Sequence, residues 1–250
     1  MHAVAIIPAR LGSTRFPEKV LAARTGKPLV QHVAEAASGA RSVRRVVVAT
    51  DSERVVEALR PYGTEVVMTG AEHPNGTSRL AEAAAQLGLG RDEIVVNVQG
   101  DEPEAAAEII DLAVSELVRS GAEVATAASP FAEGEDPSDP NIVKAIVGQN
   151  GLALYFTRAR APFHRDPRSG PPPSPPLKHV GLYVYRGWFL ERYVTLAPTP
   201  LERTEMLEQL RIIEHGHRIA VAIGSSPWTG IDTPAQYDAF VTRYLASGRR

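Results

Sequence analysis

The sequence has no cysteine among its 250 residues, so disulfide bonds, thiolate metal sites and cysteine nucleophiles are excluded. It also has no apolar run that approaches the roughly 20 residues needed to span a bilayer. Residues 1–7 lack the basic region that opens a signal peptide. From these absences we expect a cytoplasmic protein with no membrane insertion.

An excess of positive charge is missing too, because 27 Lys and Arg residues are set against 29 Asp and Glu residues, for a net charge of −2. A general nucleic-acid binder needs a broad basic surface, so we expect no nucleic-acid partner and only a local cationic site. The 44% content of hydrophobic residues is ordinary and allows a full core. A chain of this length suffices for one large α/β domain, or for a main domain with a small appendage.

Apolar runs alternate with stretches of helical periodicity over the first 130 residues. The predicted strands are residues 3–7, 45–50, 65–69, 93–98 and 123–128. The predicted helices are residues 28–40, 51–61 (with Asp51 and Ser52 as its cap), 77–88 and 104–120. This alternation predicts an α/β fold built on a doubly wound, mostly parallel mixed sheet. In such sheets ligands bind beyond the carboxyl ends of the strands.

The pattern changes after residue 130, where the strands become short. We predict strands at residues 142–147, 153–157, 178–185 and 218–223, and helices at residues 199–215 and 234–245. Residues 167–176 are rich in proline and predict a surface loop. We interpret the region from about 130 to 200 as a small β-rich insertion built onto one sheet, so that residues 1–250 form a single domain.

The loop after the first predicted strand collects positive charge. Pro8 is expected to end that strand, because proline cannot donate to the ladder. The loop then combines three cations with three small residues, namely Arg10, Arg15, Lys19, Gly12, Ser13 and Thr14. Small residues let backbone N–H groups approach phosphate oxygens while the cations neutralise charge, so a polyphosphate site is one interpretation. The spacing alone fits a solvated basic loop equally well, and it matches neither the Walker A nor the dinucleotide motif.

Two aspartates follow predicted strands far apart in the chain. Asp101 lies in the segment N-V-Q-G-D-E-P (97–103), where a carboxylate at a strand tip suits a hard cation shared with phosphate oxygens. An ordinary turn explains the same letters. Asp232 lies in G-I-D-T-P (230–234), which by itself is typical of a helix start.

These motifs together resemble those of the CMP-sugar synthetases, and most closely the 3-deoxy-manno-octulosonate cytidylyltransferase (CMP-KDO synthetase) family. The N-terminal P-A-R-x-x-S-x-R-x-P-x-K, the N-V-Q-G-D-E-P and G-I-D-T-P segments, H-V-G-L-Y-V-Y-R (179–186) and P-T-P-L-E-R-T-E-M-L-E-Q-L (198–210) occur in the family's order. The resemblance runs from residue 6 to residue 234. It implies a nucleotidyltransferase domain of the nucleotide-sugar-transferase (GT-A-like) type.

The resemblance also implies an activity, the transfer of CMP from CTP to the anomeric hydroxyl of a ulosonic acid, KDO above all, with release of pyrophosphate. It assigns Mg²⁺ to Asp101 and Asp232. Catalysis would rest on Arg10, Lys19, Asp101 and Asp232. The nucleotide would be bound by Pro8, Ala9, Arg10, Ser13, Lys19, Thr77 and Gln99. The acidic sugar would be bound by Arg15, Arg79, Gln99, His179, Tyr185, Glu208 and Gln209. Family members are typically dimeric and serve lipopolysaccharide biosynthesis, so we expect a homodimer that uses the region from about 130 to 200 for sugar binding and dimer contact.

The chain departs from the family at two positions. Ser78 stands where an aspartate is usual, and Lys178 replaces an arginine. These departures keep open another acceptor, such as 8-amino-KDO, a sialic-acid-like sugar or an unrelated anion. A nucleotidyltransferase that uses UTP or a sugar 1-phosphate, and a non-catalytic binding module on the same fold, remain the other hypotheses. A strand histidine such as His179 is more often structural, and an exposed helix arginine is the plain alternative for Arg79.

Overall fold

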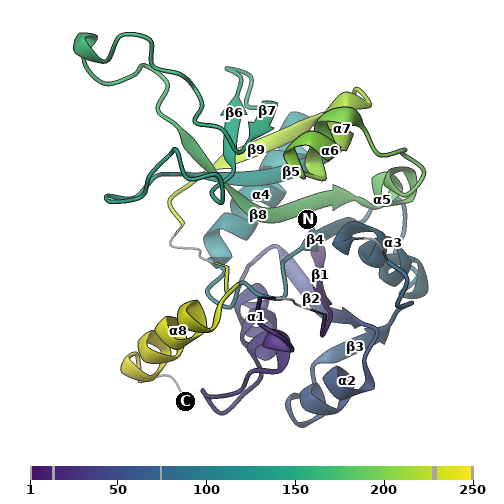
Figure 1. Cartoon of the computed structure of the whole chain (residues 1–250). Helices are drawn as coiled ribbons and strands as arrows, with labels where there is room; N and C mark the ends of the chain where they lie inside the picture. Colours follow the sequence, from purple (N-terminus) through teal and green to yellow (C-terminus); the bar gives the residue numbers. More distant parts are fainter. Residues whose placement is uncertain (1, 13–14, 74, 227–229, 249–250) are drawn as a thin grey trace.

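The computed structural model describes residues 2–12, 15–73, 75–226 and 230–248 (Figure 1). Its centre is a sheet of nine described strands. Seven of them follow the order β3-β2-β1-β4-β8-β5-β9, and the other two, β6 and β7, lie off this path, where β6 pairs with β7 and β8. The strands are β1 Ala3–Ala9, β2 Val43–Thr50, β3 Glu65–Met68, β4 Ile94–Asn97, β5 Val124–Pro130, β6 Lys144–Val147, β7 Ala153–Thr157, β8 Leu177–Arg186 and β9 Ile219–Ile223. β8 runs antiparallel to both of its neighbours, whereas β1 to β4 pair in parallel, as does β5 with β9. The predicted mostly parallel mixed sheet is confirmed.

Helices cover both faces of this sheet. They are α1 Leu29–Ser38, α2 Glu53–Leu59, α3 Gly76–Gln86, α4 Ala107–Ser120, α5 Gly187–Tyr193, α6 Pro200–Glu205, α7 Gln209–Glu214 and α8 Pro234–Ala246. In β1, Ala5 and Ile7 pack into the core formed with α1 and α4, while Val4 and Ile6 pack into the core formed with α3, α5 and α7. Alternate side chains of one strand therefore enter two cores, which is why its sequence is a continuous apolar run. Among the described residues, no helix has the length and apolar character required to cross a membrane.

The prediction that Pro8 ends the first strand is wrong, because β1 continues to Ala9. The pairing explains this. β1 pairs with β4 only as far as Ile6, whereas it pairs with β2 through Pro8 and Ala9. The last residues of β1 thus have a partner on one side only, and a strand with one open side tolerates proline.

The helix predicted over residues 199–215 is two helices, α6 and α7, separated at Met206. Met206 adopts a left-handed conformation with φ 55° and ψ 49°, which ends α6. The capping predictions also need correction. α3 begins at Gly76, one residue before the predicted start, and Asn75 caps it by accepting from the backbone N–H of Ser78. Ser52 makes no side-chain cap at α2.

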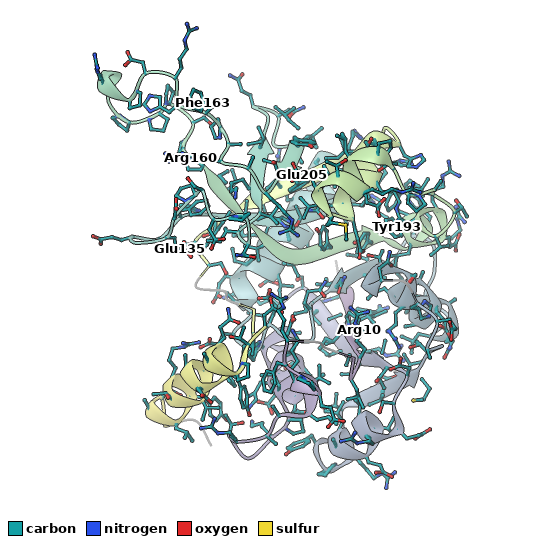
Figure 2. The ribbon with its side chains drawn as sticks, viewed as in Figure 1. Arg10, Glu135, Arg160, Phe163, Tyr193 and Glu205 are labelled. Carbon is teal, nitrogen blue, oxygen red and sulfur yellow. The ribbon has the colours of Figure 1, made fainter. Side chains whose placement is uncertain are left out.

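The region from about 130 to 200 contributes β6, β7 and β8 to the same sheet. Between β7 and β8 the chain forms a long loop that projects from the body of the molecule (Figure 1). Figure 2 labels two residues on this loop, Arg160 and Phe163, and Phe163 is 82% exposed. The role of this region in sugar binding and dimer contact stays a prediction.

Candidate active site

The loop after β1 places a lysine between the two aspartates. Lys19 begins a short 3-10 turn, Lys19–Leu21, and the preceding Glu18 adopts a left-handed backbone with φ 56°. The Glu18 carboxylate is held by the Arg54 guanidinium of α2, with Nη2 2.8 Å from Oε2. This ion pair holds the start of the turn against α2. The Lys19 side chain extends toward the segment that follows β4 and toward the loop that precedes α8.

Lys19 Nζ lies 2.5 Å from Asp101 Oδ2, 3.0 Å from Asp232 Oδ1 and 2.9 Å from the carbonyl oxygen of Ile231. Burial alone would lower the pKa of Lys19, but the attraction of Asp101 and Asp232 outweighs it and raises that pKa. Arg15 adds a second cation to Asp232, with Nη2 2.9 Å from Oδ2. The two aspartates that the sequence analysis singled out thus lie together, around a single ammonium group.

These residues line a cavity of about 360 Å³, which we call the small cavity; its lining includes Pro8, Arg10, Gly12, Arg15, Lys19, Gln99, Gly100, Asp101 and Asp232. A neighbouring cavity of about 550 Å³ shares Arg10, Arg15 and Gln99 with it. We call this neighbour the tyrosine cavity, because Tyr183, Tyr185 and Tyr193 line it together with Asn75, Gly76, Thr77, Asn97, Arg158, Glu208 and Gln209. Arg10 and Arg15, two of the predicted phosphate-binding cations, therefore line both cavities, whereas Lys19 lines the small cavity alone.

Gly100 is required where the two loops meet. A Cβ at this position would lie 2.6 Å from the carbonyl oxygen of Pro8, well inside van der Waals contact. The absence of a side chain lets the segment that carries Asp101 approach the end of β1 closely. This explains why Pro8 and Asp101 line one cavity.

The lining of the tyrosine cavity includes buried polar side chains. Asn97 Oδ1 and the Tyr193 hydroxyl are buried and make no hydrogen bond among the described residues. Burial raises the pKa of Glu208, although Arg211 partly opposes the effect. Burial also raises the pKa of Tyr185. Unpaired buried polar atoms in a recess are favourable points of contact for a hydroxyl-rich ligand.

Sequence analysis missed Glu102, the residue next to Asp101. Its Oε2 is buried without a hydrogen-bond partner among the described residues. Burial, with the nearby charges of Asp101 and Asp232, raises its pKa well above the usual value. Gly181 and Gly230 lie beside it, since a Cβ on either would be 3.6 or 3.4 Å from Glu102 Oε1, an ordinary contact distance. The motif G-D-E-P contains this residue, but only the fold shows that its carboxyl group is buried.

Two predicted sugar contacts lie outside both cavities. Arg79 is buried in α3, where it donates to Thr69 Oγ1 at 2.7 Å and pairs with Asp51 Oδ2 at 3.0 Å, so the exposed-helix interpretation is wrong. His179 Nε2 lies 2.8 Å from Thr126 Oγ1 in the sheet. Neither side chain lines the small cavity or the tyrosine cavity, and their role in sugar binding stays a prediction.

Two predicted nucleotide contacts, Ala9 and Ser13, do not present a described side chain to either cavity. The Ala9 side chain is fully buried in the core, so any contact with a nucleotide would come from its backbone. Ser13 lies outside the described residues.

The chain departs from the family pattern at two positions, and both side chains have partners. Ser78 hydrogen-bonds to Asn75, and Lys178 pairs with Glu135 Oε1 at 2.7 Å.

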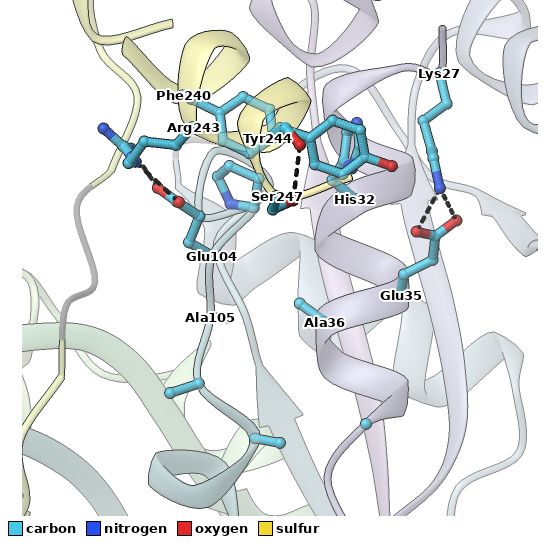
Figure 3. A pocket seen from close by; sticks show the side chains of 14 residues that line it. Lys27, His32, Glu35, Ala36, Glu104, Ala105, Phe240, Arg243, Tyr244 and Ser247 are labelled. Carbon is cyan, nitrogen blue, oxygen red and sulfur yellow. Dashed lines mark hydrogen bonds and ion pairs between the residues drawn. The ribbon is translucent and has the colours of Figure 1, made fainter. Parts of the chain in front are cut away.

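A larger cavity of about 830 Å³ lies between α1, α8 and the segment that leads into α4 (Figure 3). None of the predicted site residues lines it. Its cations already have carboxylate partners, because Lys27 pairs with Glu35 at 2.8 Å and Arg243 pairs with Glu104. The predicted phosphate-binding cations Arg10, Arg15 and Lys19 line the small cavity and not this one.

The chemistry of the small cavity suits a divalent cation shared with a substrate. Among the described residues, no group of three or more His, Cys, Asp or Glu side chains is arranged to hold a metal ion by itself. Asp101 and Asp232 nevertheless bring two carboxylates to one point, and Ile231 adds a carbonyl oxygen beside them. Mg²⁺ prefers oxygen ligands and is commonly held by one or two carboxylates together with substrate phosphates. The residues present fit that arrangement.

Known proteins share this architecture. A family model described as cytidylyltransferase matches residues 4–219. The structure of CMP:2-keto-3-deoxy-manno-octonic acid synthetase complexed with CTP is similar with a TM-score of 0.91 and 35% sequence identity, over 99% of this chain and 100% of that chain. A cytidylyltransferase from Leptospira borgpetersenii serovar Hardjo-bovis has a TM-score of 0.61 and 17% identity, over 98% and 88%. A protein from Bacillus anthracis assigned as a glucose-1-phosphate thymidylyltransferase, in complex with sucrose, has a TM-score of 0.65 and 16% identity, over 96% and 95%. The last two show the fold alone.

Proposed function

This chain belongs to the cytidylyltransferase family, and we propose that it transfers CMP from CTP to the anomeric hydroxyl of KDO and releases pyrophosphate. The observation that carries the proposal is the pairing of a cationic small cavity with a polar tyrosine cavity. The similar synthetase, 35% identical over the whole chain, was solved with CTP. A nucleotide triphosphate and an acidic sugar both need positive charge where they meet, and Arg10 and Arg15 line both recesses.

The residues of the small cavity would handle the triphosphate. Arg10, Arg15 and Lys19 present positive charge to its oxygens and to the pyrophosphate that leaves. Asp101 and Asp232 would hold Mg²⁺, which screens the charge between two anionic substrates and lowers the pKa of the attacking hydroxyl. In the reaction a bond forms between the anomeric oxygen and the α-phosphorus, and the bond to pyrophosphate breaks. No side-chain nucleophile is needed, so these residues act by position and charge.

The residues of the tyrosine cavity would orient the sugar. Tyr185, Glu208 and Gln209 line it beside Gln99, which reaches both recesses. Carboxylate, amide and phenol groups can each bond sugar hydroxyls without carrying positive charge. Arg79 and His179 remain predicted sugar contacts, and their positions favour an indirect effect through α3 and the sheet.

A different acidic sugar is the second candidate acceptor, and a specific observation favours it. Ser78 lies at the N-terminus of α3, next to Thr77, which lines the tyrosine cavity. A serine in place of an aspartate removes a negative charge from this edge of the recess. Because the side chain at this edge differs from the family pattern, other acidic sugars, such as 8-amino-KDO or a sialic-acid-like sugar, are part of the test.

The test is release of pyrophosphate from CTP and Mg²⁺ in the presence of KDO, 8-amino-KDO, neuraminic acid or no acceptor. We expect release with KDO. Release with another acid alone would keep the chemistry and change the acceptor. Absence of release with every acceptor, in a protein that binds CTP, would contradict the proposal and favour a non-catalytic binding module.

Three further proposals accompany this function. We propose a homodimer in which the region from about 130 to 200 meets the partner, as the family resemblance implies, and the projecting loop of this region exposes the Phe163 side chain. A role in lipopolysaccharide biosynthesis follows from KDO as acceptor. A cytoplasmic location stays a prediction. Light scattering of the intact chain and of Phe163→Ser would test the dimer, and a monomeric intact chain would contradict it.

A further inference from the structure

We propose that Lys19 is a displaceable occupant of the metal site, whose ammonium group and a divalent cation bind the Asp101–Asp232 pair in alternation. The inference rests on the proposed function only in taking these two aspartates as the metal ligands. It adds a second role for Lys19, beyond contact with phosphates.

The contacts of Lys19 are those of a small cation. Its Nζ is surrounded by three oxygens, Asp101 Oδ2 at 2.5 Å, Ile231 O at 2.9 Å and Asp232 Oδ1 at 3.0 Å. The side chain is only 12% exposed, so the ammonium is placed between the carboxylates and does not lie loosely on the surface. Carboxylate and carbonyl oxygens are also the ligands that Mg²⁺ prefers.

Two cations cannot share this position. A divalent ion on the same oxygens would lie beside the ammonium, and like charges at such distances repel strongly where water is partly excluded. Metal binding must therefore expel Lys19 from between the aspartates. Since Lys19 also lines the small cavity with Arg10 and Arg15, the released ammonium has an aqueous recess to enter, and this is the recess proposed for the triphosphate.

The aspartates remain together when Lys19 leaves. The backbone N–H of Ile231 donates to the carbonyl oxygen of Asp101 at 2.9 Å, and this bond does not involve Lys19. The capping box of α8, in which Thr233 and Gln236 bond each other's backbone, fixes the loop that carries Asp232. The pair is thus held by the backbone, so exchange of its cation does not require the site to be rebuilt.

Chemical labelling of the unmodified protein gives the first test. Acetylation of lysine amines by an N-hydroxysuccinimide ester is followed by peptide mass spectrometry, without nucleotide, at concentrations of Mn²⁺ where electron paramagnetic resonance shows the ion bound. We expect the acetylation rate of Lys19 to rise about tenfold, as an amine released from two carboxylates becomes accessible. Lys178 is the matched control, because it is 13% exposed and paired with Glu135 away from the site. An unchanged or lower rate at Lys19 would overturn the proposal.

Metal affinity gives the second test and uses no turnover. Lys19→Met removes the ammonium but keeps most of the side-chain length, and we expect it to tighten Mn²⁺ binding to the nucleotide-free protein by about tenfold. Arg15→Met is the matched control, since it removes a cation that touches Asp232 but not Asp101, and we expect a smaller effect. Lys19→Gln provides a second variant if Lys19→Met does not fold. Unchanged or weaker binding in the Lys19 variants would overturn the inference.

The outcome is separable from that of the proposed function. If every sugar acceptor failed but Lys19→Met tightened Mn²⁺ binding, the exchange at Asp101 and Asp232 would stand and the substrate assignment would fall. If pyrophosphate were released with KDO but Mn²⁺ affinity did not respond to Lys19, the function would stand and the exchange would be wrong.

Discussion

The backbone N–H of Ile231 donates to the carbonyl oxygen of Asp101 over 2.9 Å, and this bond joins two loops that are far apart in the chain. It places Asp232, the next residue, beside Asp101 without any direct contact between the two carboxylates. The side chains are then free to share a cation. A main-chain bond therefore does the positioning, and the carboxylates are left for chemistry.

The first prediction concerns these carboxylates. Asp101→Asn keeps the size of the side chain and removes its charge, so the proposed Mg²⁺ loses a ligand. We expect turnover to fall by at least about a hundredfold, while the fold is kept because Asp101 is partly exposed and the Ile231 bond uses its backbone. Steady-state pyrophosphate release and circular dichroism measure the two effects. Near-normal turnover would remove Asp101 from the proposed mechanism.

The second prediction concerns the close approach at Gly100. Gly100→Ala would place a Cβ 2.6 Å from Pro8 O, and because the obstacle is backbone it cannot rotate away. We expect a loss of about 2 kcal/mol in the free energy of unfolding, the usual scale of such overpacking. Gly12→Ala is the matched control in the same cavity, since a Cβ there meets nothing within 4 Å. Urea unfolding compares the two, and equal stabilities would contradict the prediction.

Much of the sheet could be predicted from the sequence because its strands are continuous apolar runs. Residues 153–157 match β7 at both ends, and the other predicted strands differ from β1 to β9 by a few residues. The short helix α5 was missed. It follows β8 directly, and its Phe189 and Leu190 are buried by tertiary packing.

The candidate site was predictable in part. Lys19, Asp101 and Asp232 were identified because each belongs to a motif, and the fold brings them within hydrogen-bonding distance. The burial of Glu102 was not predictable, since it depends on segments far apart in the chain, which include Gly181 and Gly230, packing beside it. The burial of Arg79 was not predictable either, because its partner Asp51 comes from the end of another strand. A sequence motif can identify which residues belong to a site, but whether a side chain is buried depends on how distant segments pack in the fold.

The third prediction concerns the break between α6 and α7. Met206 has a left-handed backbone, which is strained for a residue with a Cβ. Its side chain is 76% exposed, so burial of that side chain contributes little stability to offset the strain. We expect Met206→Gly to raise the free energy of unfolding by about 1 kcal/mol, because glycine adopts this conformation without a clash. Met206→Ala is the control, since it also removes the side chain but keeps the Cβ. A gain in the alanine variant equal to that in the glycine variant would contradict the argument.

The fourth prediction concerns pH and His179. Burial lowers the pKa of His179 to about 4, and the ring lies against Phe156 and Tyr183 while bonding Thr126. In the unfolded chain a histidine has a pKa of about 6.5. Between these two values the unfolded state binds a proton that the folded state does not, so the free energy of unfolding falls as the pH falls from about 6.5 to about 4. Below that range both states are protonated and this loss stops growing.

His179→Gln should remove that dependence, because glutamine can still bond Thr126 but does not titrate. His179 as a whole residue is only partly buried, so we expect its share of the acid-side loss to be about 2 kcal/mol, less than the full shift in pKa would give. Urea unfolding of both proteins at pH 7 and pH 4.5 measures the difference, and equal slopes would contradict the burial argument. The KM for the acidic sugar, measured on the same variant at neutral pH, then decides the role of His179. An unchanged KM assigns it to the sheet, whereas a raised KM with unchanged stability assigns it to the sugar.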